Sequence, residues 1–239
     1  MSLTILMPSK NEEKIIINTL KRINKSIISK IDYEIIVIDD FSDDSTWSLV
    51  KNLKNSNQVK LIKNNIPGLG SAIKLGIKRS SKKYVCIYMT DQSDSLNDLF
   101  KYYKLITKGN YDAIFGSRFM EGSKVIRYPL KKLIFNRIFN NICKLMFLNS
   151  FNDYTNAFKI YKKKVLLSFF PIVSENFNVF LELPLKTIAR KHKFKVIPIS
   201  WHNRKKGKSK FVINELTSKY FFTLLYCFFE KILLKKNAK

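Results

Sequence analysis

The sequence predicts an α/β fold in which helices flank a mostly parallel sheet. Strand-like and helix-like segments alternate four times before Arg118, which is typical of βαβ units with right-handed crossovers. Two strand segments, 34–39 and 84–90, are apolar between their ends, as expected of strands buried on both faces. Each of them is followed by a polar cluster that contains carboxylates.

The first half of the chain supplies these elements in a regular series. We expect strands at 3–7, 34–39, 59–62, 84–90 and 112–115. Helices are expected from Asn11 to about 30, from Asp44 or Ser45 to about 55, from within 65–71 to about 79, and from 96 to about 108. Asn, Asp and Ser are common N-cap residues, and apolar residues recur at helical spacing in these segments.

The regular alternation stops after Arg118. We expect helices at about 133–148, 177–191 and 213–234, strands at 153–161 and 194–199, and a basic loop at 201–210. No clean domain linker interrupts the chain. The sequence therefore predicts one main domain over 1–212, followed by an amphipathic basic helix over 213–239.

Charge is distributed unevenly along the chain. The 239 residues carry a net charge of +26. Residues 121–239 hold 25 Lys and Arg against six Asp and Glu, whereas residues 1–120 hold 19 against 12. Such a basic surface favours a polyanion: nucleic acid, an anionic membrane or a phosphorylated substrate. A drift of composition towards Lys, which only aids solubility, is the alternative.

The three cysteines show no C-x-x-C spacing, which favours a reducing compartment with buried thiols. The first residues lack the basic start and cleavage site of a signal peptide. No apolar run reaches the length that spans a bilayer. We therefore expect a cytoplasmic protein, peripheral on the inner face of a membrane.

Carboxylates follow two different predicted strands. Asp39 and Asp40 end one strand, and Asp91 and Asp94 come just after another. Ligands of open α/β sheets bind beyond the carboxyl ends of the strands. Carboxylates there can bind a nucleobase or ribose, or hold Mg²⁺ or Mn²⁺ beside a diphosphate. Two ordinary solvated turns are the competing interpretation.

The glycine pair Gly68 and Gly70 does not complete a nucleotide-binding motif, because the third glycine of G-x-G-x-x-G would fall at Ile73. We expect these glycines to let a ligand or a neighbouring strand approach. The run 204–210 is basic and contains Gly and Ser, so it could fold over a phosphate or could be an exposed basic run.

Taken in order, these segments resemble family 2 glycosyltransferases, in the branch of dolichyl-phosphate mannosyltransferase and polyprenyl-phosphate sugar synthases. The resemblance covers about residues 3–211. The matching pieces are 7–12, 37–46, 68–72, Asp91, 115–118, 152–159 and 198–210.

The resemblance implies a GT-A fold, a nucleoside-diphosphate sugar donor and Mg²⁺ or Mn²⁺. It divides the main domain into a nucleotide-binding half, about 1–118, and an acceptor and phosphate-loop half, 119–212. By this likeness Asp91, Arg118 and Arg204 are the expected catalytic residues. Substrate-binding positions are then expected at Pro8, Glu12, Asp39, Asp40, Gly70, Arg127, Ser209 and Lys210.

The metal site departs from the family pattern. The family often has Asp-x-Asp here, but the first Asp position is Met89, and a third ligand position is Ser93. We expect Asp91, Ser93 and Asp94 to be the metal ligands, with donor phosphates or water completing the shell.

The resemblance implies inverting transfer of a hexose to a polyprenyl phosphate, either dolichyl or undecaprenyl. A phosphate acceptor is already anionic and needs no general base. A hydroxyl acceptor on a cell-surface glycan or lipid would need one, and Glu182 or Asp153 would be the candidate.

The closing helix is a candidate membrane-binding element. Its large apolar residues recur at helical spacing beside lysines: Tyr220, Phe221, Leu224, Leu225, Phe228, Phe229, Ile232 and Leu233. Packing of this helix on the sheet, or on a membrane-protein partner, is the alternative.

Two other functions fit some of these features. A non-enzymatic basic protein could bind nucleic acid or an anionic membrane, but no nucleic-acid-binding motif is present, and we expect no nucleic-acid partner. A nucleotidyltransferase also places carboxylates beyond parallel strands. It would be expected to show a Gly-rich basic loop near its N-terminus, which residues 8–13 lack.

Overall fold

The computed structural model describes residues 2–53, 58–203 and 213–236. The strands are β1 (Ser2–Ser9), β2 (Asp32–Asp39), β3 (Val59–Lys63), β4 (Tyr84–Ile87), β5 (Ala113–Ser117), β6 (Lys124–Ile126), β7 (Lys159–Lys162), β8 (Phe194–Pro198) and β9 (Ser200–His202). The helices are α1 (Ile16–Asn24), the 3-10 helix η1 (Ile27–Lys30), α2 (Thr46–Lys51), α3 (Leu69–Arg79), α4 (Leu96–Lys108), α5 (Leu130–Phe147), α6 (Lys163–Ser168), α7 (Val179–Ala189) and α8 (Ile213–Lys236).

Seven of the strands form one sheet in the order β3-β2-β1-β4-β7-β5-β8. All neighbouring strands are parallel except β7, which runs antiparallel to both β4 and β5. The predicted mostly parallel sheet is therefore confirmed. Strands β6 and β9 make a separate two-stranded parallel sheet.

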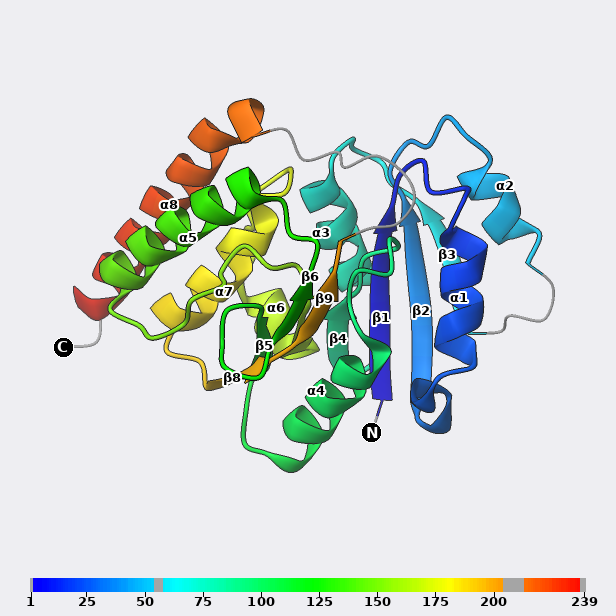
Figure 1. Ribbon diagram of the computed structural model, residues 1–239, viewed down its shortest axis with the longest axis horizontal. Coiled ribbons are helices and arrows are strands. Elements are labelled where there is room, and N and C mark those ends of the chain that lie inside the picture. The colour runs from blue at the N-terminus through cyan, green and yellow to red at the C-terminus, as the bar shows by residue number, and fades with distance from the viewer. Residues whose placement is uncertain (1, 54–57, 204–212, 237–239) are drawn as a thin grey trace.

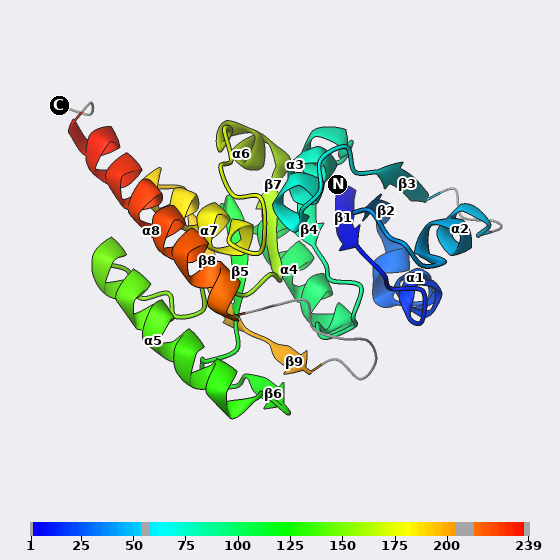
Figure 2. The same ribbon diagram turned by 90° about the horizontal axis from the view of Figure 1, so that it is seen from above.

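Helices cover both faces of the large sheet (Figures 1 and 2). One buried apolar cluster joins β1, β2 and β4 to α1 and α4, through residues such as Leu20 and Leu99. A second cluster joins the opposite face to α3, α5, α6, α7 and α8, through residues such as Ile73 and Phe147. Strand β4 contributes to both, because Val85 belongs to the second cluster and Cys86 to the first. This alternation explains why the segment reads as a continuous apolar run.

Several elements are shorter than their sequence patterns suggest. The first helix was expected from Asn11, but α1 begins at Ile16 and ends at Asn24. Asn11 has a positive φ, and its side chain bonds the Asp43 carboxylate, so it serves a loop instead of capping a helix. At the other end the Ser26 hydroxyl donates to the carbonyl of Ile23, which ends the helix.

The central strand also ends early. It was expected to reach Thr90, but β4 ends at Ile87. Thr90 is buried and its hydroxyl bonds that of Ser9 at 2.7 Å, so side-chain contacts replace the ladder there. The segment expected as a strand over 153–161 forms one only at β7, and the sequence did not indicate α6, the separate short helix that follows.

The C-terminal helix is part of the protein core. Tyr220, Leu224 and Cys227 of α8 are buried in the cluster that contains α5 and α7. Phe221, Phe222 and Leu233 are exposed on its other side. The apolar set expected on one face is therefore divided between an inner and an outer side. Within the described ranges, none of the helices combines the length and apolar character needed to cross a bilayer.

Helices α5 and α8 lie side by side and run in the same direction (Figures 1 and 2). The Phe139 and Tyr220 rings are 5.7 Å apart near the start of the pair, and the Phe147 and Phe228 rings are 6.2 Å apart further along. The Lys231 ammonium donates to the carbonyl of Phe147 at 2.7 Å, which fixes the far end of the pair.

Candidate functional site

A cavity of about 750 Å³ lies at the carboxyl ends of β1, β2 and β4. These ends are at the top of the sheet in Figure 1. One wall is made by residues that follow the three strands, and another by side chains of α5, α7 and α8. Six predicted site residues meet there, of which Asp91 and Ser93 are also the predicted metal ligands: Pro8, Glu12, Asp40, Asp91, Ser93 and Arg118.

The acidic wall starts beyond β1 and β2. The backbone N–H of Glu12 donates to the Thr46 hydroxyl at 2.8 Å, which ties the loop after β1 to the start of α2. The Asp40 Oδ1 accepts from the Asn64 amide at 2.8 Å and from the Gly68 N–H at 2.9 Å. These bonds hold the carboxylate against the start of α3, in the wall of the cavity.

Asp39, next to Asp40, is turned into the protein. It is buried and is not among the residues that line the cavity. Its Oδ2 accepts a long bond from the Ser42 N–H at 3.4 Å, and its buried Oδ1 has no partner among the described residues. A buried carboxylate oxygen without a donor is costly, but this oxygen does not open onto the cavity, so the expected role of Asp39 in substrate binding stays a prediction.

Beyond β4, the cavity wall contains Met89, Asp91 and Ser93. The backbone N–H of Ser93 donates to the Asp91 Oδ1 at 3.0 Å, which closes a tight turn around the carboxylate. The carbonyl of Ser93 accepts from the N–H of His202 at 2.9 Å. Strand β9, whose residues Trp201 and His202 were expected to begin the basic loop at 201–210, is therefore fastened next to Asp91.

Asp94 lies behind this wall. It is buried, does not line the cavity, and its Oδ1 has no partner in the described part of the chain. Burial, and next the charge of Asp91, raise the pKa of the Asp94 carboxyl to about 8. Because the Asp94 carboxyl is enclosed behind the cavity wall, its expected role as a metal ligand stays a prediction that this geometry does not favour.

Asp91 and Ser93 fit a divalent cation that shares its coordination with a phosphorylated molecule. Mg²⁺ prefers oxygen ligands and commonly uses one or two protein carboxylates together with substrate phosphates and water. In the ranges that the structure describes, no group of three or more His, Cys, Asp or Glu is placed to hold a metal ion. The donor set thus suits a shared site and does not suit one built from protein alone.

Arg118 is fixed by an ion pair inside the cavity wall. Its Nε and backbone N–H donate to the Asp153 Oδ2 at 2.8 and 2.9 Å, and its Nη2 donates to Oδ1 at 2.6 Å. The Nη1 donates to the Tyr128 hydroxyl at 3.3 Å, and the Trp201 ring lies 5.8 Å from the guanidinium carbon. Burial alone would lower the pKa of Arg118, but the Asp153 charge raises it, so the side chain stays cationic.

The two carboxylates considered as general bases are both engaged elsewhere. Asp153 is fully buried under Arg118. Glu182 is fully buried on α7, where it accepts from the N–H groups of Val173 and Ser174 and pairs with Lys186 at 2.9 Å. Neither residue lines the cavity.

Gly70 is placed against protein and not against the cavity. Its N–H donates to the carbonyl of Glu175 at 2.7 Å, and a Cβ there would lie 2.3 Å from the carbonyl oxygen of Ser174. Gly68 does line the cavity, with a φ of 127°. Of the two expected uses of these glycines, the close approach of a neighbouring segment is the one seen at Gly70.

The remaining predicted positions lie apart from the cavity. Arg127 is exposed, on β6's side of the molecule, and does not line the cavity. Arg204, Ser209 and Lys210 lie outside the described residues, so their expected role stays a prediction.

Sequence reasoning missed an aromatic wall. Besides Trp201, five aromatic side chains line the cavity: Phe135, Phe139, Phe177, Phe180 and Tyr220. Phe135 and Phe139 belong to α5, Phe180 to α7 and Tyr220 to α8, and Phe177 lies just before α7. In the sequence each of them fits the apolar spacing of an ordinary helix. The density of aromatic residues in the basic half of the chain was the only available signal.

Comparison with known families gives this geometry a context. Residues 4–170 match the family model described as glycosyl transferase family 2. The chain belongs to this family. The resemblance drawn from the ordered motifs is thereby confirmed.

Several curated proteins are similar to this chain in sequence. The chain is 26% identical over 215 residues to a dolichol-phosphate mannosyltransferase of Pyrococcus furiosus, across 88% of this chain and 59% of that protein. It is 30% identical over 203 residues to an uncharacterised protein of Methanocaldococcus jannaschii, across 82% and 79% of the two chains. The match to the poly(ribitol-phosphate) β-N-acetylglucosaminyltransferase TarP of Staphylococcus aureus is 28% identical, across 68% and 49%. The chain thus spans between about half and four fifths of these relatives.

Solved structures show the same fold. Glucosyl-3-phosphoglycerate synthase from Mycobacterium tuberculosis, crystallised with Mn²⁺, UDP and phosphoglyceric acid, aligns with a TM-score of 0.69 at 16% identity. The alignment covers 95% of this chain and 78% of that one. The GT-A type of fold expected for the family is confirmed.

Proposed function

We propose that this member of family 2 is an inverting glycosyltransferase that moves a hexose from a nucleoside-diphosphate sugar to a polyprenyl phosphate. One observation carries the proposal. A single cavity joins carboxylates beyond the strand ends, the fixed cation Arg118 and a wall of aromatic side chains. The carboxylates would serve a nucleotide sugar and its metal ion, Arg118 would serve a phosphate, and the aromatic wall would serve an isoprenoid chain.

The carboxylate wall is the proposed nucleoside site. Pro8, Glu12 and Asp40 line the cavity there, and Asp39 is buried next to Asp40. Carboxylates accept hydrogen bonds from ribose hydroxyls and from the N–H groups of nucleobases. Glucosyl-3-phosphoglycerate synthase, which was crystallised with UDP, has the same fold, and this likeness supports a nucleotide donor.

Asp91 and Ser93 would hold Mg²⁺ or Mn²⁺ next to the donor diphosphate, where the ion would supply positive charge for the leaving group. Arg118 would add positive charge beside the donor diphosphate. Three of its five N–H donors are engaged by Asp153 and Tyr128 side chains. The other two can be offered to a phosphate, and the ion pair keeps the guanidinium in one orientation.

The transfer itself requires no protein base. A phosphate oxygen of the acceptor attacks the anomeric carbon while the bond from that carbon to the diphosphate oxygen breaks, so the configuration inverts. No proton moves, because the acceptor phosphate is already anionic. The burial of Asp153 and Glu182 away from the cavity favours this acceptor over a hydroxyl group. We propose that Arg204, Ser209 and Lys210 add phosphate contacts when substrates are bound.

The aromatic wall is the proposed start of the isoprenoid path. Phe135 and Phe139 of α5 and Tyr220 of α8 line the cavity, and the two helices continue away from it side by side (Figure 2). Their outer sides are apolar: Leu145 of α5 is 75% exposed and Leu233 of α8 is 60% exposed. Large apolar side chains exposed on two neighbouring helices favour an interaction site there.

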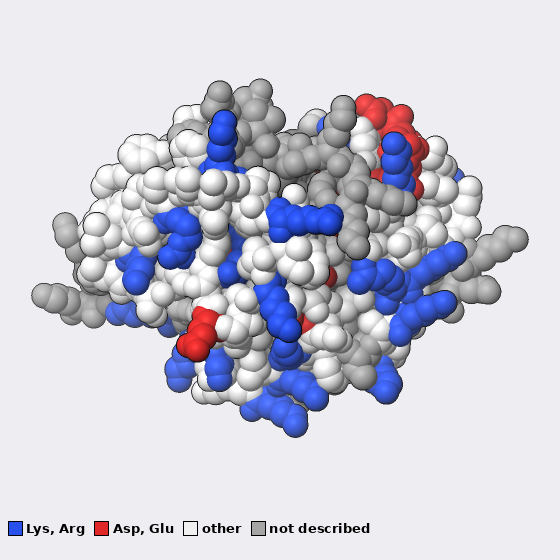
Figure 3. All heavy atoms as spheres, viewed as in Figure 1, with Lys and Arg blue, Asp and Glu red and all other residues white. Residues whose placement is uncertain are grey.

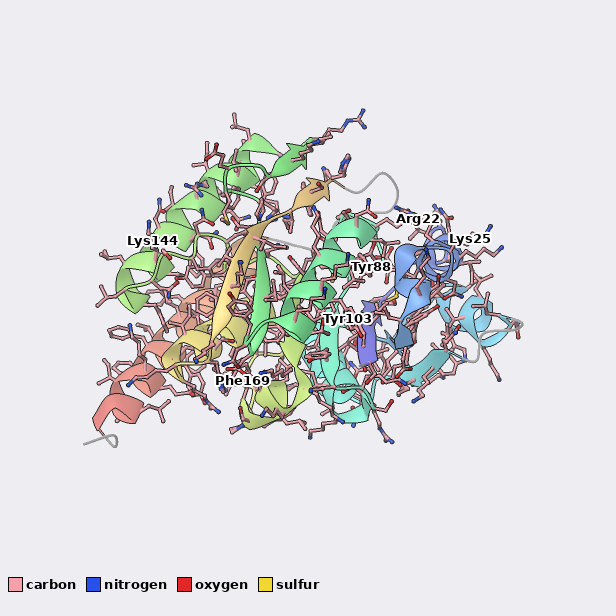
Figure 4. All side chains as sticks on the ribbon, turned by 90° about the horizontal axis from the view of Figure 1, so that it is seen from below. Arg22, Lys25, Tyr88, Tyr103, Lys144 and Phe169 are labelled. Atoms are coloured by element: carbon pink, nitrogen blue, oxygen red, sulfur yellow. The ribbon has the colours of Figure 1, made fainter. Side chains whose placement is uncertain are left out.

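We propose that the outer sides of α5 and α8 rest on the inner face of an anionic membrane, which keeps the enzyme cytoplasmic and peripheral. On the face that Figure 3 shows, Lys and Arg side chains are widely spread, and acidic side chains gather around the loops before α2. Lys144 lies on α5, at the opposite end of the molecule from Arg22 and Lys25 (Figure 4). Basic residues beside an apolar helix face are typical of interfacial helices.

The activity is tested with radiolabelled donors. The purified chain is incubated with GDP-mannose, UDP-glucose or UDP-N-acetylglucosamine, polyprenyl phosphate and Mn²⁺, and organic-extractable label is counted. We expect a lipid-linked product with one donor. Asp91→Asn should abolish it, whereas Asp32→Asn, a surface carboxylate at the far end of β2, should not. Label transferred only to hydroxyl acceptors would contradict the lipid phosphate as acceptor.

Membrane binding is tested by flotation with anionic vesicles. Ile138→Glu/Leu145→Glu places two charges on exposed positions of α5 that do not line the cavity. We expect this variant to remain at the bottom of the gradient while the wild type floats. Leu49→Glu, an exposed position on α2, is the matched control and should float. Equal flotation of all three proteins would contradict the membrane proposal.

A further inference from the structure

Tyr128 lies in the short connection between β6 and α5. It does not line the cavity, but three residues that it contacts do: Arg118, Asn136 and Trp201. The Tyr128 hydroxyl accepts from the Arg118 Nη1 at 3.3 Å and from the side-chain amide of Asn136. The Tyr128 ring lies 5.0 Å from the Trp201 ring and 5.3 Å from the guanidinium carbon of Arg118. Tyr128 thus supports the cavity wall from behind.

The ion pair with Asp153 occupies only one edge of the Arg118 guanidinium. Asp153 accepts from Nε and Nη2, whereas Nη1 donates to the Tyr128 hydroxyl. The rings of Phe119 and Trp201 lie 5.4 and 5.8 Å from the guanidinium carbon, and such rings hold a cation without forming hydrogen bonds to its N–H groups. Removing the Tyr128 hydroxyl would therefore release Nη1 and leave the ion pair intact.

The second bond of the Tyr128 hydroxyl leads to α5. Asn136 of α5 donates to this hydroxyl, and its Oδ1 accepts from the Thr155 hydroxyl at 2.7 Å. Thr155 stands two residues after Asp153 in the chain, so the bonds form a closed circuit that returns to Arg118 through Asp153. Hydrogen-bond networks whose members are all paired make a structure rigid.

We propose that Tyr128 is a positioning residue for the transfer reaction, which holds Nη1 so that the remaining N–H groups of Arg118 face the phosphate in the cavity. The inference rests on the proposed glycosyl transfer. A cation stabilises a transition state most when its orientation is fixed before the reaction starts. In this role Tyr128 donates no proton and touches no substrate. It acts only through Arg118.

A thermodynamic cycle on binding tests the proposal without turnover. Binding of inorganic pyrophosphate to the full chain is measured by calorimetry for the wild type, Tyr128→Phe, Arg118→Lys and the double variant. Tyr128→Phe should weaken binding by about fivefold or more. In the Arg118→Lys background the same change should have little effect, because residues of one network are not additive.

The matched control is Tyr33→Phe. It also removes a hydrogen-bonded phenol hydroxyl, which donates to Asn24 at 2.8 Å. Tyr33 stands near the amino end of β2, away from the cavity at the carboxyl ends. This variant should bind pyrophosphate as the wild type does.

Turnover gives a readout that a purely structural role would not move. With the donor that yields a lipid-linked product, Tyr128→Phe should lower kcat by about tenfold or more, since small misplacements of a reacting group are costly. The KM for the donor should change less, because negative charge on the leaving diphosphate grows during the transfer. A larger change in KM than in kcat would contradict the positioning role.

Three binding results would also overturn the inference. One is equal weakening by Tyr128→Phe in the wild-type and Arg118→Lys backgrounds, another is unchanged binding by Tyr128→Phe, and the third is no binding of pyrophosphate by the wild type. If Arg118→Lys fails to fold, the comparison of Tyr128→Phe with Tyr33→Phe still decides. If the cycle gives the expected result but no donor yields a lipid-linked product, the proposed function fails and the positioning of Arg118 by Tyr128 stands.

Discussion

The ion pair between Arg118 and Asp153 links two residues 35 positions apart in the chain. Arg118 follows β5 and Asp153 precedes β7, and these strands are neighbours in the sheet. Asp153 is fully buried, so its charge is tolerated only because three N–H groups of Arg118 point at it. Asp153, a candidate base for a hydroxyl acceptor, instead holds the Arg118 guanidinium in one orientation.

Replacing Asp153 by Asn should therefore destabilise the fold. It leaves the buried Arg118 guanidinium without its counter-charge, and we expect the free energy of unfolding to fall by about 3–5 kcal/mol. Urea unfolding followed by circular dichroism measures the change. Asp32→Asn removes the exposed pair with Lys82 and should cost no more than about 1 kcal/mol. Equal losses for the two variants would contradict a buried pair.

A second residue-scale prediction concerns Glu34. Burial would raise the pKa of its carboxyl, but the Lys60 ammonium and hydrogen bonds from Ser81 and Thr4 lower it to about 2. A lowered pKa contributes stability above pH 4.5 that is lost as the pH falls towards 2. The stability advantage of the wild type over Glu34→Gln should thus shrink from pH 5 to pH 2 in urea unfolding. A constant difference across this range would refute the prediction.

Among elements, the start of α3 depends on the segment before α7. The Gly70 N–H bonds the Glu175 carbonyl, and the Ser174 N–H bonds Glu182 on α7. The Thr223 hydroxyl of α8 accepts from the Asn178 amide at 2.9 Å. The nucleoside side of the cavity and the C-terminal helix are therefore joined through this one buried segment.

Gly70→Ala tests that contact. In an ordinary helix the change from Gly to Ala is stabilising by about 1 kcal/mol. Here a Cβ would lie 2.3 Å from the carbonyl oxygen of Ser174, which is backbone and cannot turn aside. We expect destabilisation by about 1–3 kcal/mol, measured by thermal or urea unfolding. An increase in stability would show that α3 and the 174–175 segment are not in contact.

For the whole molecule, the charge of +26 and the outer sides of α5 and α8 act together. Each basic residue near an anionic surface contributes about 1 kcal/mol, and salt screens that contribution. Apolar contact is not screened. Vesicle binding of the wild type should thus weaken but persist at high salt, whereas Ile138→Glu/Leu145→Glu should lose binding altogether there. If high salt released the wild type from the vesicles completely, the attachment would be electrostatic alone and the predicted apolar contact would be refuted.

Part of this architecture could be read from the sequence. Strands β1 and β2 and helices α3 and α4 lie close to their predicted ranges, because apolar runs, helical spacing and terminating polar residues are local signals. The boundaries of α1 and β4 could not be read in this way. They depend on bonds between Asn11 and Asp43 and between Ser9 and Thr90, whose partners are far apart in the chain.

The same division holds for the candidate site. The sequence by itself determined that carboxylates stand at the carboxyl ends of two strands and that Met89 precedes Asp91, because strand ends and their order are encoded locally. Only the tertiary structure decided that Asp40 faces the cavity while Asp39 turns inward, that Asp153 belongs to Arg118, and that α5 and α8 complete an aromatic wall. Each of these facts is a contact between distant segments, and such contacts exist only once the chain has packed.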